Sequence, residues 1–214
     1  MPAKDCGLFD PEGTEISKTA LIVVDVQNDF CHHEGVFGKY KKMDLGHVTR
    51  AVKNLAAFIR KCRQFKLPVV FIKTTHSPWT DSPSWLSRLK DTDKKMRACP
   101  PDSWGSDFFG VAPKKGDCIV IKHRYSAFVN TDLDLILRSR GIENIIVTGV
   151  VTNVCVESTA RDGFNRDYNV IVLEDCCGAY GIEEHAATLH NIRTHFGSVL
   201  TSGALVELLK GKGR

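Results

Sequence analysis

Asp25, Lys122 and Cys155 carry side chains that together could hydrolyse an amide, although they lie far apart in the sequence. A cysteine thiol near a helix N-terminus and an ammonium group is expected to ionise readily and to attack a carbonyl carbon. A carboxylate can take the thiol proton and pass it to a leaving amine. Backbone N–H groups at the start of a helix can stabilise the oxyanion that forms. This combination predicts acyl transfer from an amide-like carbonyl to sulfur and then to water.

The elements that must position these side chains follow from the hydrophobic pattern. Short apolar runs predict strands, helical spacing predicts helices, and the two kinds of segment alternate along the chain. The strands are expected at 20–25, 69–72, 118–122, 144–148, 169–173 and 198–201, and the helices at 48–66, 131–140, 153–168, 182–195 and 203–210. This alternation indicates an α/β fold, a three-layer sandwich with a doubly wound, mostly parallel six-stranded sheet and helices on both faces.

The predicted sheet brings the three side chains together. Asp25 and Lys122 end their strands, and Cys155 lies near the start of the helix after residues 144–148. Ligands of parallel sheets bind beyond the carboxyl ends of the strands, so we expect these residues at one edge. Each also has a structural interpretation: a helical cysteine often fills the core, an aspartate often caps a turn, and a lone lysine often lies on the surface. Their joint placement favours the catalytic interpretation.

Composition limits the class of protein. The chain has 214 residues, of which 43% are hydrophobic and 25% charged, as in a globular protein. We predict one domain over 1–214, with an N-terminal extension at 1–17 and a frayed tail at 209–214. The net charge of +4 is small for a nucleic-acid binder. Without an apolar run of about 18 residues or a secretory signal, we expect no membrane partner, a cytoplasmic location and eight free thiols.

Three segments resemble the isochorismatase-like cysteine hydrolases. They are ALIVVDVQNDF at 20–30, IKHRYSAF at 121–128 and TGVVTNVCVEST at 148–159. Their order and spacing are specific, and the similarity extends over about 18–208. The stretches RSRGI (138–142) and CVESTARDGF (155–164) look nearest to the ureidoacrylate amidohydrolase branch.

The resemblance implies a role for each matched residue. Asp25 would be the general base and acid, Lys122 the cation beside it, and Cys155 the nucleophile. A cis peptide between Val150 and Val151 would aim the amides of Val151 and Cys155 into one oxyanion hole. The family likeness also implies a homodimer or homotetramer.

Departures from the family patterns narrow the activity. Members that act on isochorismate lack the cysteine, so Cys155 argues against vinyl-ether hydrolysis. Nicotinamidases carry a metal-binding Asp-x-His and a further histidine after the second strand, which residues 74–81 (TTHSPWTD) do not repeat. We therefore predict no metal and no cofactor.

The predicted enzyme is a cysteine-dependent hydrolase of carbon–nitrogen bonds other than peptide bonds. It would act through a thioester on a small amide or ureido substrate, ureidoacrylate-like or N-carbamoyl-like. Another primary amide such as nicotinamide remains an alternative substrate. A non-catalytic binding member of the fold is the alternative from another class.

Substrate-binding residues are predicted from their sequence positions near the three catalytic candidates and in the long segment 74–110. They are Phe30, Gln27, Asn28, Trp79, Tyr125 and Phe128. The aromatic rings would form walls or a cover, and the two amides would bind a polar substrate or buttress Asp25. Trp85 and Trp104 lie in the same long segment. Arg124 is a candidate for binding a substrate carboxylate, with a surface salt bridge as the open alternative.

Overall fold

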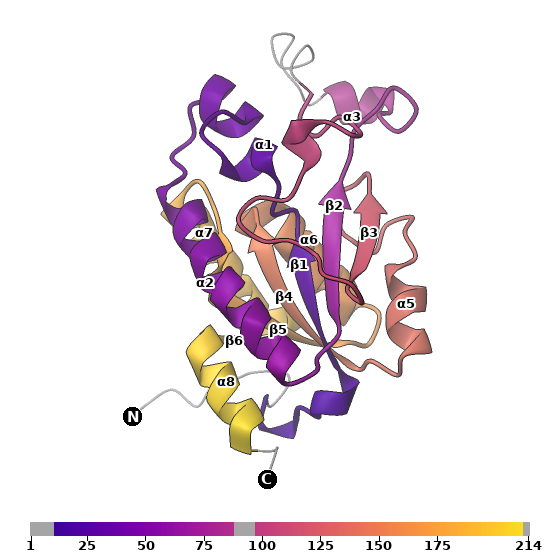
Figure 1. The fold of residues 1–214 in the computed structure, drawn as a ribbon, viewed down its shortest axis with the longest axis vertical. Coiled ribbons are helices and arrows are strands. Elements are labelled where there is room, and N and C mark those ends of the chain that lie inside the picture. The colour runs from indigo at the N-terminus through magenta and orange to yellow at the C-terminus, as the bar shows by residue number, and fades with distance from the viewer. Residues whose placement is uncertain (1–10, 88–96, 212–214) are drawn as a thin grey trace.

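Six parallel strands form one sheet in the order β3-β2-β1-β4-β5-β6 (Figure 1). This computed structural model describes residues 11–87 and 97–211. The strands are β1 (Thr19–Val24), β2 (Val69–Thr74), β3 (Cys118–Lys122), β4 (Asn144–Val150), β5 (Asn169–Gly178) and β6 (Ser198–Leu200). The predicted α/β fold with a six-stranded sheet is confirmed, and every neighbouring pair of strands is parallel.

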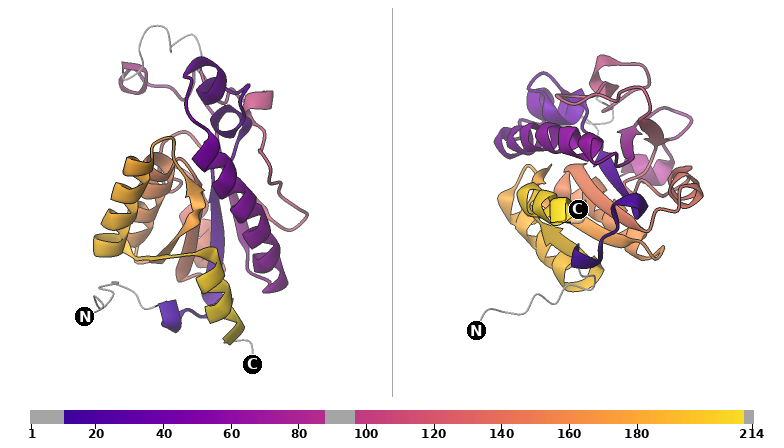
Figure 2. Two further views of the ribbon diagram at one scale, coloured as in Figure 1. Left: turned by 90° about the vertical axis from the view of Figure 1, so that its left-hand side faces the viewer. Right: turned by 60° about the horizontal axis from the view of Figure 1, so that its bottom comes forward.

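Helices cover both faces of the sheet, as expected for continuously apolar parallel strands (Figure 2). One face carries α2 (Gly46–Gln64) and α8 (Ser202–Gly211), and the other carries α5 (Leu133–Ser139), α6 (Glu157–Phe164) and α7 (Ile182–Asn191). Alternate residues of β1 serve the two cores. Leu21 and Val23 pack in the cluster with α2, whereas Ile22 and Val24 pack in the cluster with α5 and α6.

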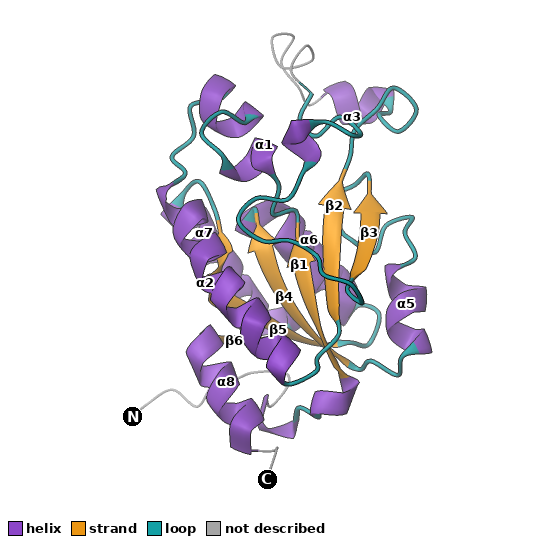
Figure 3. Ribbon diagram, in the orientation of Figure 1, coloured by secondary structure: helices purple, strands orange, loops and turns teal. Residues whose placement is uncertain are grey.

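Short helical segments, most of which the sequence did not predict, lie around the carboxyl ends of the strands (Figure 3). They are α1 (Asn28–Cys31), a π-helical turn at Val36–Tyr40, α3 (Pro83–Ser87), a 3₁₀ turn at Trp104–Ser106 and a π-helical turn at Thr152–Val156. A further π-helical turn at Ile192–Phe196 follows α7, and two 3₁₀ turns, Pro11–Gly13 and Ile16–Lys18, precede β1. The segments after β1, β2 and β4 build the rim of the sheet.

Several elements differ in length from the sequence prediction, and two of the differences bear on the site. The helix expected at 153–168 is shorter, because the chain first makes the turn at Thr152–Val156 and α6 ends at Phe164. The strand expected at 169–173 continues to Gly178, because β5 pairs with β4 again beyond an irregularity in the register. The turn at Thr152–Val156 and the added length of β5 lie at the sheet edge that holds the catalytic candidates, whereas α6 ends at the opposite edge, near the start of β5.

Gly149 allows β4 to approach β1 closely at this edge. Its φ of 113° lies in a region that residues with a side chain rarely adopt. A Cβ atom there would also lie far inside van der Waals contact with the carbonyl oxygen of Val24. The glycine therefore sets the position of the chain that leads from β4 to Cys155.

The ends of the chain are described only in part. Residues 1–10 of the predicted N-terminal extension and residues 212–214 lie outside the described ranges, whereas residues 209–211 belong to α8. The seven cysteines of the described ranges are free thiols. Within these ranges, no helix has the length and apolarity that crossing a membrane requires.

Candidate active site

Asp25 occupies the first position after β1, where the chain turns sharply. Its φ of 51° is left-handed, a conformation that aspartate tolerates better than most residues. Its N–H donates to the carbonyl of Ile72 at 3.1 Å, and its carbonyl accepts from the N–H of Gln27 at 2.8 Å. These bonds fix a side chain that is fully buried at the sheet edge.

Lys122 ends β3, the edge strand, and β2 lies between it and the strand that leads to Asp25. Its ammonium nitrogen Nζ lies 2.7 Å from Oδ2 of Asp25. The same nitrogen donates to the carbonyl of Arg124 at 2.8 Å and to Sγ of Cys155 at 3.5 Å. Lys122 thus contacts both of the other catalytic candidates, and its side chain is only 1% exposed.

Cys155 lies in the turn Thr152–Val156, between β4 and α6. The turn begins just after a cis peptide between Val150 and Val151, which the family resemblance implied. The carbonyl of Val151 accepts from the N–H groups of Val154 at 3.0 Å and Val156 at 3.3 Å. The structure therefore brings all three predicted catalytic residues together from distant parts of the chain.

Burial dominates the electrostatics of this cluster. It raises the pKa of Asp25, and the Lys122 ammonium opposes the rise only in part. Burial also raises the pKa of the Cys155 thiol, again against the influence of Lys122. For Lys122, burial acts to lower the pKa, but Asp25 and Cys155 together reverse this, and the pKa rises.

Burial thus works against the ready ionisation of the Cys155 thiol that we expected from its sequence position. The reason is that desolvation of the buried sulfur outweighs the effect of the nearby ammonium on the thiol pKa. A nucleophilic sulfur in this site needs a base that takes its proton.

The Asp25 carboxylate has the capacity to be that base. Within residues 11–87 and 97–211, no N–H or O–H group makes a hydrogen bond of good geometry to either of its oxygens, although Lys122 pairs with one. The Cys155 thiol is its other polar neighbour. Buried carboxylates are normally well supplied with donors, so this one retains lone pairs that can accept a proton.

A cavity of about 510 Å³ gives a substrate access to Lys122 and Cys155. Of the six predicted substrate-binding residues, Phe30 and Tyr125 line it. Val151 and Cys155, the predicted oxyanion-hole residues, also line it. The cavity has about the volume of a small-molecule site.

The structure places the other four predicted substrate-binding residues outside the cavity lining. Gln27 is fully buried, and its amide binds the backbone of Thr74 and Ser106. Asn28 likewise donates to the carbonyl of Trp104 at 2.8 Å. Both side chains hold the rim together, because the backbone of the irregular segments needs partners.

The two remaining predicted aromatic residues point elsewhere. Phe128 is in the core and stacks on Tyr168, with ring centroids 5.7 Å apart. Trp79 is 96% exposed. A different tryptophan of the same segment, Trp85, lines the cavity and packs on Tyr125, with ring centroids 4.9 Å apart.

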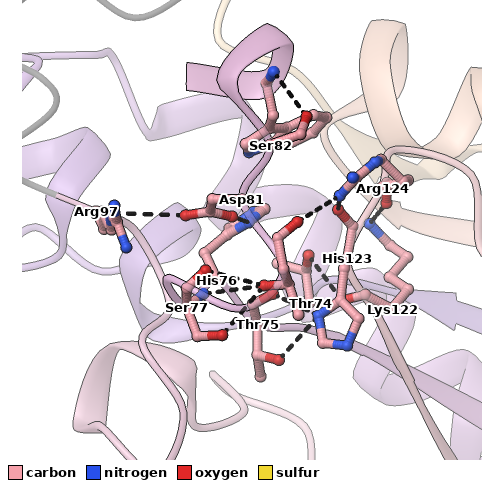
Figure 4. A network of polar contacts seen from close by, with 12 residues as sticks. Thr74, Thr75, His76, Ser77, Asp81, Ser82, Arg97, Lys122, His123 and Arg124 are labelled. Atoms are coloured by element: carbon pink, nitrogen blue, oxygen red, sulfur yellow. Dashed lines mark hydrogen bonds and ion pairs between the residues drawn. The ribbon is translucent and has the colours of Figure 1, made fainter.

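Sequence reasoning missed three residues of a polar wall of the cavity, His76, Asp81 and Arg97 (Figure 4), although it had named Arg124. His76 and Asp81 lie 3.0 Å apart, from Nδ1 to Oδ1, and Arg97 Nε lies 3.6 Å from Oδ2 of Asp81. Arg124 forms part of the same wall. The available signal was that the segment follows β2, but loop residues carry no periodicity that shows which of them face inward.

The described residues contain no group of three or more histidine, cysteine, aspartate or glutamate side chains arranged to hold a metal. His76 and Asp81 are a pair, and Arg97 lies against the same carboxylate. The absence of a metal from the reaction remains a prediction.

The chain is similar to known proteins in both sequence and structure. The isochorismatase domain model matches residues 19–204. The chain belongs to the isochorismatase family. This membership confirms both the resemblance and the expected hydrolase class.

Relatives of this isochorismatase-family chain include two amidases and a cysteine hydrolase. A ureidoacrylate amidohydrolase, RutB, of Methylobacterium radiotolerans is 35% identical over 204 residues, covering 89% of this chain and 79% of that protein. A cysteine hydrolase of Pseudomonas syringae pv. phaseolicola has a similar structure, with a TM-score of 0.83 and 28% identity, covering 96% of this chain and 97% of the other. An N-carbamoylsarcosine amidase of Thermoplasma acidophilum superposes with a TM-score of 0.69 and 30% identity, covering 86% and 96%.

Proposed function

We propose that this hydrolase cleaves a carbon–nitrogen bond of a small ureido or N-carbamoyl substrate through a covalent intermediate on Cys155. The observation that carries the proposal is the position of Cys155. Its sulfur lies at the wall of a cavity of about 510 Å³ and 3.5 Å from the ammonium of Lys122, which is paired with Asp25. The names of the relatives, a ureidoacrylate amidohydrolase and an N-carbamoylsarcosine amidase, support this substrate class.

In the first half of the reaction, Asp25 takes the proton of the Cys155 thiol as the sulfur attacks the substrate carbonyl. A sulfur–carbon bond forms, and the carbonyl oxygen becomes an oxyanion. The N–H groups of Val151 and Cys155 are the proposed donors to this oxygen. Lys122 retains its charge throughout and stabilises the carboxylate and the developing anion.

In the second half, the tetrahedral intermediate collapses. The carbon–nitrogen bond breaks, and the leaving nitrogen takes the proton that Asp25 received from the thiol. Water then attacks the thioester-like carbonyl and gives a proton to Asp25. The sulfur–carbon bond breaks, and the proton returns to sulfur, so that the resting thiol is restored.

The test is turnover by the Cys155→Ala variant against a panel of ureido acids, carbamoyl amino acids and primary amides. We expect turnover to fall to background while the circular dichroism spectrum stays the same. Cys118→Ala is a matched control, because Cys118 is a partly exposed cysteine of β3 outside the cavity lining. It should retain activity.

Mass spectrometry of the intact protein, after rapid quenching with substrate, tests the intermediate itself. The expected result is an acyl or carbamoyl adduct that maps to Cys155 in the wild type. Retained turnover by Cys155→Ala would refute the mechanism. A panel without any turnover and without an adduct would favour a binding member of the fold.

We also propose that the chain works in the cytoplasm as a homodimer or homotetramer. The family resemblance is the support for this assembly. Sedimentation equilibrium of the purified protein measures the mass directly, and a mass equal to that of one 23.8 kDa chain would contradict it.

A further inference from the structure

Asp29, in α1, carries a buried carboxylate that takes no part in the proposed reaction. The residue is only 6% exposed. Among residues 11–87 and 97–211, no cationic side chain lies within ion-pair distance of its oxygens. Burial of a carboxylate is costly unless hydrogen-bond donors replace the water that it loses. The donors that bind Asp29 therefore indicate what this side chain contributes to the fold.

Two backbone N–H groups from distant segments bind this carboxylate. The N–H of Val36 donates to Oδ1 at 3.1 Å, and the N–H of Cys99 donates to Oδ2 at 2.6 Å. Both hydrogen bonds are buried, where such bonds are stronger than in water. Gly105 lies against the same carboxylate, because a Cβ atom there would be 2.1 Å from Oδ2. Asp29 thus joins α1 to three other segments of the rim.

The two segments that donate to Asp29 also supply part of the cavity wall. Val36 and its neighbour Phe37 line the cavity. Arg97 and Ala98, the two residues that precede Cys99, line it as well. Neither segment belongs to the sheet, so its position depends on contacts of this kind. The carboxylate therefore fixes two stretches of the wall relative to α1.

The bond to Cys99 supports the polar wall in particular. Cys99 has a left-handed φ of 53°, a conformation that a residue with a side chain rarely adopts without support. Its carbonyl accepts from the N–H of His76 at 3.0 Å. The His76 ring lies 3.0 Å from Asp81, which lies 3.6 Å from Arg97 (Figure 4). Asp29 therefore anchors the backbone on which His76 is placed.

The polar wall continues directly to the reacting groups. Thr75, the residue before His76, donates its N–H to the carbonyl of Lys122 at 3.1 Å. The ammonium nitrogen of Lys122 contacts Sγ of Cys155 at 3.5 Å. Lys122 and Cys155 are held by other segments, β3 and the turn at Thr152–Val156. A change at Asp29 should therefore move the wall and leave the reacting groups in place.

We propose that Asp29 is a positioning residue, which holds the cavity wall where substrate binding requires it relative to Cys155. Its contribution is to the affinity for the substrate and not to the reactivity of the sulfur. The kinetic part of this inference rests on the proposed function. The structural part, the placement of His76 by Asp29, does not.

Steady-state kinetics of Asp29→Ala with 3-ureidoacrylate test the effect on binding. We expect KM to rise at least about tenfold and kcat to change by less than about threefold, because the wall contacts the substrate equally in the ground state and the transition state. Asp29→Asn keeps one acceptor oxygen, so its KM should lie between those of the wild type and Asp29→Ala. A loss of folded protein alone would lower kcat and leave KM unchanged.

The ring resonances of His76, measured with isotope-labelled histidine and assigned with His76→Gln, test the inference without turnover. They should shift in Asp29→Ala, because the release of Cys99 alters the hydrogen bond between His76 and Asp81. A change in stability alone does not move the resonances of the folded molecules. If Asp29→Ala does not fold, Asp29→Asn provides the same two measurements.

Asp175→Ala is the matched control. The Asp175 carboxylate also accepts two hydrogen bonds, from the N–H of Ser202 at 2.7 Å and from its hydroxyl at 2.6 Å, but Asp175 lies outside the cavity lining. This variant should lose stability in urea and keep both the KM and the His76 resonances of the wild type.

Three results would overturn the role of Asp29. They are an unchanged KM in a folded Asp29 variant, His76 resonances that stay the same in every folded Asp29 variant, and an equal rise of KM in Asp175→Ala. Absence of turnover in the wild type would instead count against the proposed function, and the His76 resonances would then decide the role of Asp29.

Discussion

At the scale of single residues, the site depends on a buried ion pair whose members share one neighbour. Asp25 and Lys122 are both almost without exposure, and both contact Cys155. Burial of the carboxylate is costly, but the same burial makes it a stronger base toward the thiol. The raised pKa of Asp25 therefore has a direct kinetic consequence.

Asp25 must be ionised to accept the thiol proton, and its pKa lies above the ordinary value of 3.8. As the pH falls, Asp25 therefore becomes protonated earlier than an ordinary aspartate, and kcat/KM should decline at a correspondingly higher pH. Measurements of kcat/KM across the acidic range show the pH at which this decline occurs. Asp25→Asn should reduce turnover by several orders of magnitude.

The control for this pH profile is Asp162→Asn, an exchange on α6 near Arg166, outside the cavity lining. This variant should leave unchanged both kcat/KM and the pH at which kcat/KM declines. Two results would contradict the assignment of Asp25 as the base. One is a decline of kcat/KM at the pH where an ordinary aspartate titrates, and the other is an Asp25→Asn enzyme that keeps substantial activity.

At the scale of elements, the join between β4 and the turn at Thr152–Val156 decides where the sulfur lies. Gly149 is paired with Val24 of β1 and has the backbone angle that lets the two strands approach. A register irregularity between β4 and β5 falls at the same position. The local backbone, rather than a long helix, therefore places Cys155.

Gly149→Ala should destabilise the protein by at least about 3 kcal/mol, because the added methyl group is both strained and in collision with Val24. Urea denaturation measures the free energy of unfolding. Gly141→Ala is a matched control at a φ of 64°, where a Cβ meets nothing within 4 Å. There the cost should be only the backbone term of about 1–2 kcal/mol. Equal costs at the two positions would show that the close approach is not tight.

At the scale of the whole molecule, two histidines connect the helical layers on opposite faces of the sheet. His185 of α7 is buried, and its Nδ1 lies 3.0 Å from the hydroxyl of Thr152, the first residue of the turn with Cys155. Its ring centre is 4.5 Å from that of His47 on α2, whose Nδ1 accepts from the N–H of Ala179. The pair ties both layers to the active-site rim.

Burial, with a smaller contribution from His47, lowers the pKa of His185 from 6.5 to about 4. The unfolded chain therefore binds a proton between these pH values that the folded chain does not, so stability should fall as the pH drops through this window. The loss should be on the order of 1–3 kcal/mol. Urea denaturation at pH 7 and pH 4.5 measures it, with His185→Gln expected to reduce the difference. His195 is exposed, so His195→Gln should leave the difference as it is. If His185→Gln also leaves the difference in unfolding free energy unchanged, His185 is not its source.

The sequence predicted the layers, and it placed Asp25 and Lys122 of the candidate site, for one physical reason. Buried parallel strands are continuously apolar, so the sequence shows where each strand ends. Asp25 and Lys122 lie at two of those ends. The cavity wall could not be read in this way. Trp79 and Trp85 are six residues apart in one irregular segment, and only tertiary packing decides that the second faces inward. The raised pKa of the Cys155 thiol could not be predicted either, because its largest cause is burial, which the sequence does not show.

The edge position of β3 has a consequence for how activity is lost. An outermost strand has a neighbour on one side only, so it is among the parts that can detach while the remaining sheet persists. Lys122 is delivered by that strand and must pass over the end of β2 to reach Asp25. A partly unfolded molecule that has released β3 would keep Asp25 and Cys155 in place but lose the Lys122 ammonium that contacts both. Loss of activity should therefore accompany the detachment of the edge strand β3, before the rest of the fold unfolds.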